Sequence, residues 1–182
     1  DPKNLRRVSV FQEASDADLA LLVEKGILRS IEEGEFFFFQ GDPAVYFYIM
    51  VSGKAKLLQS NPSGQQVNLR TINEWEMFGA LGISKPNANY PATAQALESS
   101  TVLAIESKFM QTMLETRPQI AFGLMNLMTS YIQEMQARYR ELATERVEQR
   151  VANALIRLAG QSGTKSSKEA GIELFFSRQD VA

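Results

Sequence analysis

The segment Phe36–Gly53, FFFFQGDPAVYFYIMVSG, constrains the fold of this chain more than any other stretch. Two runs of aromatic and aliphatic residues are separated by Gln40-Gly41-Asp42-Pro43, and the second run ends at Ser52-Gly53. Apolar β-formers bounded by Gly, Asp and Pro predict two strands joined by a tight turn. We expect Gly41 and Gly53 to adopt backbone angles that other residues reach only with strain.

The strand-like pattern continues from residue 27 to residue 105, where apolar residues occur in short runs between turn-forming residues. The turn Asn61-Pro62-Ser63-Gly64 should close a hairpin. Many short strands at near-regular spacing predict a barrel or β-roll rather than a doubly wound sheet. The expected strands cover residues 28–31, 36–40, 47–51, 54–59, 67–72, 92–96 and 102–105.

Three segments have the spacing of amphipathic helices. Residues 16–25 follow Ser15, which is a good N-cap, and precede Gly26, which suits a helix exit. Residues 108–116 carry a shorter helical pattern. Pro118 then opens a pattern that predicts one helix to about residue 144, a rod of about 40 Å at about 1.5 Å per residue. Such a rod is longer than one β-roll needs for cover.

The long helix carries apolar residues at alternating steps of three and four, which suits a parallel helix pair between two subunits. An intramolecular helix lying on its own roll would give the same pattern, and one helix can do both because a second stripe (Met125, Ile132, Tyr139) adjoins the first. The expected dimer interface consists of Ala121, Leu124, Met128, Tyr131, Met135, Arg138 and Leu142.

The absence of cysteine and histidine from the 182 residues excludes several kinds of site. The chain can have no disulfide, no cysteine-ligated iron–sulfur cluster, no haem held by His or Cys and no ordinary zinc site. Serine–histidine and cysteine–histidine catalysis are excluded as well, and we expect no catalytic residues and no metal site. The net charge of −2 gives no overall basic footprint, although a small basic module can still bind DNA.

The hydropathy of the chain predicts a cytoplasmic protein. No run of 18 or more apolar residues is present, and the N-terminal residues do not have the pattern of a signal peptide. We therefore expect no membrane partner.

The Phe36–Gly53 segment resembles the first signature of the cyclic-nucleotide-binding β-roll: a glycine–acid pair, a small residue, four apolar residues, two spacers and a glycine. The order of elements along nearly the whole chain resembles the Crp/Fnr transcription regulators. This resemblance implies an α+β fold with a jelly-roll-like double-stranded β-helix as sensor domain (1–116), a dimerisation helix (117–145) and the N-terminal part of a winged helix-turn-helix domain (146–182).

The C-terminal segment Ser177-Arg178-Gln179-Asp180-Val181-Ala182 has a good N-cap in Ser177, with Asp180 placed as in a capping box. After a further expected helix over 147–159, it resembles the first helix of the Crp/Fnr helix-turn-helix, although a capped terminal helix is the alternative. The resemblance implies that Ser177, Arg178 and Gln179 contact DNA phosphates, and that RNA polymerase and a second copy of the chain are partners. The base-reading helix would follow beyond this segment.

The resemblance also places an effector pocket. Cyclic-nucleotide binders carry Phe-Gly-Glu-Leu and then Arg-Ser-Ala, whose glutamate and arginine hold the ribose and the cyclic phosphate. This chain has Ala80 and Tyr90 at those two positions. The prediction is an apolar pocket that does not bind cyclic AMP and takes an unknown small effector. Its expected residues are Phe78, Gly79, Ala80, Leu81, Tyr90, Pro91, Ala92, Met135 and Gln136, with Ile83 beside them.

The same residues leave other ligands and one other function open. The segment 89–100 resembles the branch that responds to nitric oxide, where haem is the expected cofactor, but its axial ligand here would have to be Met, Tyr, Lys or a terminal amine. The methionines of the long helix have the spacing of packing residues. Lys85 could meet an anion, although a solvated loop lysine is the commoner role. The alternative function is a ligand-binding regulatory module that does not bind DNA.

Overall fold

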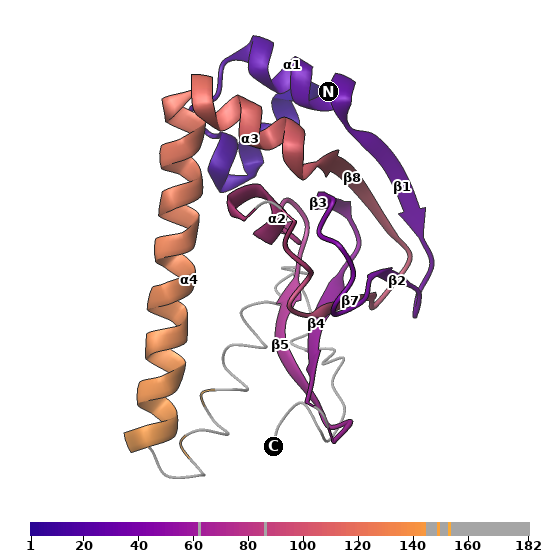
Figure 1. The fold of residues 1–182 in the computed structure, drawn as a ribbon, viewed down its shortest axis with the longest axis vertical. Helices are drawn as coiled ribbons and strands as arrows, with labels where there is room; N and C mark the ends of the chain where they lie inside the picture. The colour runs from indigo at the N-terminus through magenta and orange to yellow at the C-terminus, as the bar shows by residue number, and fades with distance from the viewer. Residues whose placement is uncertain (62, 86, 145–148, 150–152, 154–182) are drawn as a thin grey trace, which may run out of the picture. The chain divides into compact units, whose positions relative to one another are not determined.

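The computed structural model of the chain describes residues 1–61, 63–85, 87–144, 149 and 153 (Figure 1). It divides into two compact units, residues 1–128 and 129–182, with the division inside the long helix. The first unit contains two antiparallel four-stranded sheets and the helices that cover one of them (Figure 1). The expected boundaries near residues 116 and 145 stay predictions.

The two sheets confirm the predicted β-roll. One sheet has the order β1-β8-β3-β6 and the other the order β2-β7-β4-β5. Strand β6 was not predicted, because a two-residue strand leaves no periodic pattern. The strands are β1 (Ile27–Ile31), β2 (Phe36–Phe38), β3 (Tyr46–Ser52), β4 (Ala55–Ser60), β5 (Gln66–Ile72), β6 (Met77–Phe78), β7 (Thr93–Ala96) and β8 (Ser100–Glu106).

The turn inside Phe36–Gly53 joins strands β2 and β3, as predicted, and these two strands belong to different sheets. Strand β2 pairs with β7 whereas β3 pairs with β8 and β6, so the turn carries the chain from one sheet to the other. Gly41 and Gly53 have φ angles of 95° and 92°, as expected. The hairpin expected at residues 61–64 is confirmed, because β4 pairs with β5.

The helices predicted over residues 16–25, 108–116 and 118–144 are present, whereas the helix expected over 147–159 lies outside the described residues apart from 149 and 153. Helix α1 (Asp16–Lys25) has the expected cap, since the amide of Asp18 donates to Ser15 Oγ at 3.1 Å. Helices α3 (Ser107–Thr116) and α4 (Pro118–Thr144) follow. Within the described residues no helix has both the length and the apolarity needed to cross a membrane. The elements that were not predicted are two 3-10 turns, η1 (Pro2–Arg7) and η2 (Ser9–Phe11), and the short helix α2 (Leu81–Ser84).

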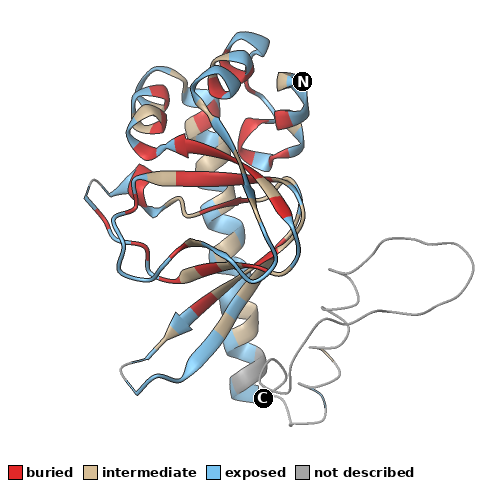
Figure 2. Ribbon diagram, turned by 90° about the vertical axis from the view of Figure 1, so that its right-hand side faces the viewer, coloured by how far each residue is buried: buried red, intermediate tan, exposed pale blue. Residues whose placement is uncertain are grey.

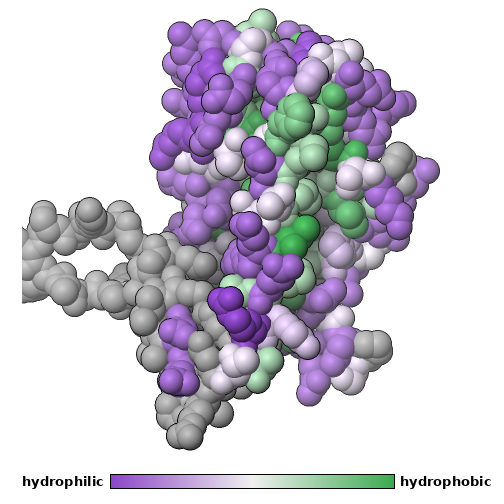
Figure 3. Space-filling view, turned by 90° about the vertical axis from the view of Figure 1, so that its left-hand side faces the viewer, coloured by the Kyte–Doolittle hydropathy of each residue, from purple (hydrophilic) through white to green (hydrophobic). Residues whose placement is uncertain are grey.

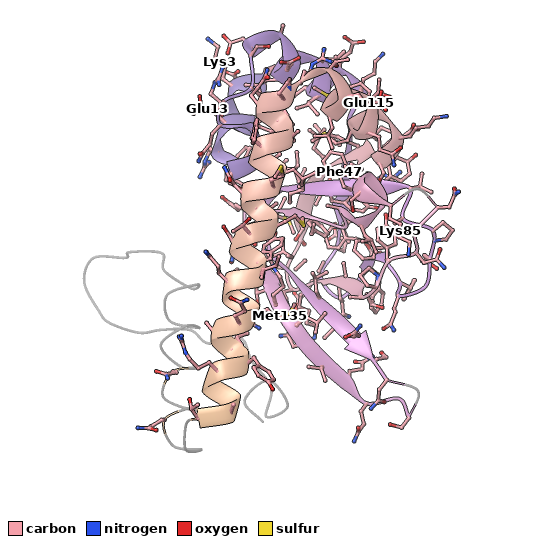
Figure 4. The ribbon with its side chains drawn as sticks, turned by 60° about the vertical axis from the view of Figure 1, so that its left-hand side comes forward. Lys3, Glu13, Phe47, Lys85, Glu115 and Met135 are labelled. Carbon is pink, nitrogen blue, oxygen red and sulfur yellow. The ribbon has the colours of Figure 1, made fainter. Side chains whose placement is uncertain are left out.

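The alternation of side chains along β3 separates two cores. Phe47 and Ile49 point to the helices, while Tyr48 and Met50 point between the two sheets. The first set belongs to what we call the helix-side core, which also contains Leu19 and Ile105 (Phe47 is labelled in Figure 4). The buried residues of the first unit, which include the two cores, are coloured red in Figure 2. The second core, the roll interior, consists of Phe38, Ala44, Tyr48, Met50, Ala55, Ile72, Phe78, Tyr90, Ala94, Val102 and Ala104.

The first turns of α4 are anchored on the helix-side core. Ile120 is fully buried, and Leu124 packs against the same cluster. A Cβ on Gly123 would overlap the carbonyl oxygen of Val10, so only glycine lets the helix approach η2 this closely. Just before the helix, Arg117 forms an ion pair with the buried Asp18 of α1. These contacts fix where α4 starts.

Candidate functional site: the roll interior

Five aromatic side chains fill the roll interior, and we call them the aromatic cluster: Phe37, Phe38, Tyr48, Phe78 and Tyr90. They come from strands β2, β3 and β6 and, for Tyr90, from the loop before β7. The Phe38 and Tyr90 rings stack with centroids 3.7 Å apart and an angle of 15° between planes. The Tyr48 and Phe78 rings stack at 5.3 Å, and Phe37 meets Phe78 edge-on at 5.2 Å. Such pairs stabilise a core beyond the area they bury.

The turn of the Phe36–Gly53 segment holds Tyr90 in place. The Tyr90 amide donates to the Asp42 carbonyl at 2.8 Å, and the Gly41 amide donates to the Tyr90 carbonyl at 2.9 Å. A third hydrogen bond runs from the Ala44 amide to the Ala88 carbonyl at 2.8 Å, and Pro43 and Asn89 form a β-bridge between these bonds. The residues after α2 are therefore laid antiparallel against the Gly-Asp-Pro turn, and this pairing directs the Tyr90 ring into the roll.

The hydroxyl of Tyr90 is satisfied inside the protein. It donates to the carbonyl oxygen of Tyr46 at 2.6 Å and accepts from the amide of the same residue at 3.3 Å. The Tyr90 residue is 4% exposed. The one donor of this buried hydroxyl is therefore already used within the chain.

Gly79 allows the rings to pack against the backbone that follows β6. Its φ angle is 70°, and a Cβ added there would lie 3.1 Å from the Phe38 ring, 3.2 Å from the Tyr90 ring and 3.3 Å from the Tyr48 ring. A side chain at this position would need both a strained backbone and displaced rings.

The structure brings only some of the expected pocket residues together. Phe78, Gly79 and Tyr90 meet in the aromatic cluster, and Ala92 is buried. Ala80 packs on the helix-side core instead. Ile83 lies in the helix-side core, and Leu81 and Pro91 are exposed. Met135 and Gln136 are exposed on α4 in the second unit, so their role in the pocket stays a prediction.

Two features near the rings were missed from the sequence. The guanidinium of Arg29, on β1, lies 4.8 Å from the centroid of the Tyr46 ring. The Phe37 and Phe38 rings join the cluster, although an unbroken run of phenylalanines has no alternation that would assign a face. Lys85, in contrast, is exposed in the loop after α2 (Figure 4), where a lysine is solvated.

Burial raises the pKa of Tyr90 well above its ordinary value of 10.0, with the neighbouring Tyr48 as the next cause. Burial also raises the pKa of Tyr48. A raised folded pKa means that the stability contributed by the protonated phenol is complete below about pH 10 and is lost as the pH rises further.

We therefore expect unfolding midpoints in urea to fall between about pH 10 and 11 in the wild-type chain, and to fall less steeply in Tyr90→Phe, which retains only the Tyr48 contribution. Phe47→Leu is the control, because it removes packing from the helix-side core and no hydroxyl, so it should lower stability by the same amount at every pH. Parallel loss of stability in wild type and Tyr90→Phe would contradict the assignment.

Helix α4 carries a stripe of exposed apolar side chains, each at least 41% exposed, and Figure 3 shows apolar atoms along this face. The stripe includes two residues of the expected dimer interface, Met128 and Met135. It also includes Met125, Ile132 and Tyr139, which form the adjoining stripe expected from the sequence. We call it the α4 stripe; it consists of Phe122, Met125, Met128, Ile132, Met135 and Tyr139.

The remaining residues of the expected interface have other surroundings. Leu124 packs on the helix-side core, and Ala121 and Tyr131 are half-buried. Arg138 forms an ion pair with Glu134 at 2.6 Å. The side chain of Leu142, and the expected DNA contacts Ser177, Arg178 and Gln179 with the rest of 154–182, lie outside the described residues.

Comparison with known proteins agrees with this fold. Residues 28–117 match the family described as cyclic nucleotide-binding domain. The Global nitrogen regulator of Synechococcus elongatus is 27% identical over 178 residues, which are 96% of this chain and 77% of that protein. The CRP-like cAMP-activated global transcriptional regulator of Mycobacterium tuberculosis is 25% identical over 180 residues, or 98% of this chain and 79% of that protein.

A solved structure is similar as well. The sensor domain of the transcriptional regulator DNR from Pseudomonas aeruginosa superposes with a TM-score of 0.62 and 26% identity, covering 79% of this chain and 91% of that one. The matched residues contain the β-roll and helix α3, so this part of the chain has the fold of a cyclic nucleotide-binding domain. The homologues of the chain are transcription regulators of the Crp/Fnr family and not enzymes, which confirms the predicted resemblance.

Proposed function

We propose that this chain is the sensor and dimer-forming part of a DNA-binding transcription regulator of the Crp/Fnr type whose β-roll does not bind cyclic nucleotides. The observation that carries the proposal is Tyr90, a buried aromatic residue where cyclic-nucleotide binders have the phosphate-binding arginine. Losing one charge-assisted contact to a buried phosphate weakens binding by about 2 kcal/mol or more. The second contact is absent as well, because Ala80 stands where cyclic-nucleotide binders have the glutamate that holds the ribose.

The charge inside the roll supports this proposal. Among the residues that the structure describes, the buried polar or charged ones are Asp18, Ser100 and Ser107, so no cation is buried there. Arg29 lies over the face of the Tyr46 ring, which is not part of the aromatic cluster. A cyclic phosphate in the roll interior would therefore be desolvated without a buried counter-charge.

The α4 stripe supports the dimer. Six large apolar side chains on one helix form more exposed apolar surface than isolated surface residues do, and a second copy of the helix would cover them by symmetric packing. Ser177, Arg178 and Gln179 would then contact DNA phosphates, positioning each module without specifying sequence. RNA polymerase is the further partner that the family suggests, and the cytoplasm is where such a regulator would act.

The test uses the intact regulator and random DNA duplexes, with and without cyclic AMP. Selection should enrich inverted repeats whose half-sites are about one helical turn, roughly 34 Å, apart, and cyclic AMP should not change the enriched sequences. Calorimetry of the chain with cyclic AMP should give no saturable heat below about 1 mM.

Each arm can fail separately. Failure to enrich any inverted repeat would overturn the DNA-binding function. Micromolar binding of cyclic AMP would overturn the ligand claim alone, and its loss in Arg29→Ala would then place the phosphate beside β1.

A further inference from the structure

Tyr90 makes the contacts that a bound ligand would be expected to make in the roll interior. Its ring is stacked on Phe38 at 3.7 Å, and its hydroxyl makes two hydrogen bonds with the Tyr46 backbone. The ring also lies against the backbone at Gly79. A planar aromatic group with one polar end, held by stacking and by backbone hydrogen bonds, is what small-molecule sites commonly enclose.

The polypeptide that carries Tyr90 is itself fixed. Three backbone hydrogen bonds join residues 88–90 to residues 41–44, at 2.8, 2.9 and 2.8 Å, with the Pro43–Asn89 bridge between them. Moving the ring out of the roll would break this pairing as well as the stacking. Tyr90 is therefore built into the fold as firmly as a core residue.

We propose that Tyr90 is an internal substitute for the effector: it occupies the ligand position of the roll, so the roll is complete without a small molecule and accepts none there. The inference rests on the proposed function for the identity of this position, and it goes further by naming the residue that excludes the ligand. The space that Tyr90 fills has the shape and the hydrogen-bond partner that suit a para-substituted phenol.

The space can be tested by emptying it. Tyr90→Ala removes the ring, and 4-methylphenol, which matches the lost side chain, is the probe. Toluene is the matched probe that lacks the hydroxyl and leaves the Tyr46 carbonyl oxygen without its donor. We expect Tyr90→Ala to bind 4-methylphenol about tenfold more tightly than toluene, measured by calorimetry and by the rise in melting temperature.

The wild-type chain should bind neither probe, because its own side chain is in the way. Phe47→Ala is the control variant, since it opens a space of similar size in the helix-side core, where Phe47 is fully buried. That variant should not prefer 4-methylphenol over toluene.

Binding of 4-methylphenol to the wild-type chain, or equal binding of the two probes by Tyr90→Ala, would overturn the proposal. If Tyr90→Ala does not fold alone, refolding is scored with each probe: recovery with 4-methylphenol but not toluene supports the proposal, and recovery with both equally refutes it.

A measurement on the wild-type chain needs no variant. Nitration by tetranitromethane, mapped by mass spectrometry, should leave Tyr90 unmodified in the folded chain and modify it in the chain unfolded by urea, because Tyr90 is 4% exposed in the folded structure. Equal nitration rates of Tyr90 in the folded and the unfolded chain would refute an enclosed Tyr90. These results are independent of the DNA selection, so a chain that fails to bind DNA can still have a roll filled by Tyr90.

Discussion

Ile132→Glu should convert a dimer of this chain into monomers at micromolar concentration. Ile132 lies in the α4 stripe and is 57% exposed, so the change should leave the fold of the first unit intact. Two-fold symmetry places the new charge in the interface twice. Burying two unpaired carboxylates should weaken the dimer by about 3 kcal/mol or more, which is a hundredfold or more in Kd.

Sedimentation equilibrium across a concentration series measures the effect directly. Gln133→Glu is the matched control, because it adds the same charge to an exposed position about 100° around the helix from Ile132. That variant should remain dimeric. Leu124→Glu should behave differently again and destabilise the fold, because Leu124 packs on the helix-side core. A dimeric Ile132→Glu would show that the stripe is not the interface.

Gly53→Ala should lower the free energy of unfolding by about 3 kcal/mol, whereas Gly41→Ala should lower it by only about 1 kcal/mol. The two glycines have nearly the same φ, 92° and 95°, and so the same backbone strain on substitution. They differ in surroundings: a Cβ at Gly53 would lie 2.7 Å from Ser100 Cα, while a Cβ at Gly41 would have no atom within 4 Å.

The difference between these variants therefore isolates the steric part of the cost. Urea unfolding at neutral pH gives both values. Ser100→Ala cannot relieve the clash fully, because Ser100 Cα remains, so the Gly53→Ala, Ser100→Ala double variant should stay less stable than Gly41→Ala. Equal losses in the two single variants would mean that the Gly53 turn moves away from β8 at little cost.

Much of the fold could be predicted because its signals are local. The cap at Ser15, the exit at Gly26 and the period of α1 specify that helix without tertiary contacts. The buried face of β2 could not be predicted, because four phenylalanines in a row have no alternation that distinguishes the two faces of a strand. The pairing of residues 41–44 with 88–90 was beyond reach as well, because it joins segments more than 40 residues apart.

The candidate site shows the same division. Phe78, Gly79 and Tyr90 could be named from the resemblance, but whether Tyr90 lines an open pocket or fills it depends on packing. On α4, two neighbouring apolar stripes were visible in the sequence. The contact of Gly123 with Val10 decides between them, because it turns Leu124 toward the core and leaves Met125 and Ile132 exposed.

The Gly123 contact also has a mechanical consequence. The first turns of α4 lie directly against η2 at this contact, because no side chain at Gly123 separates the helix backbone from the Val10 carbonyl. A change in the packing of the N-terminal 3-10 turns would therefore be passed to the start of α4 without any change in the roll.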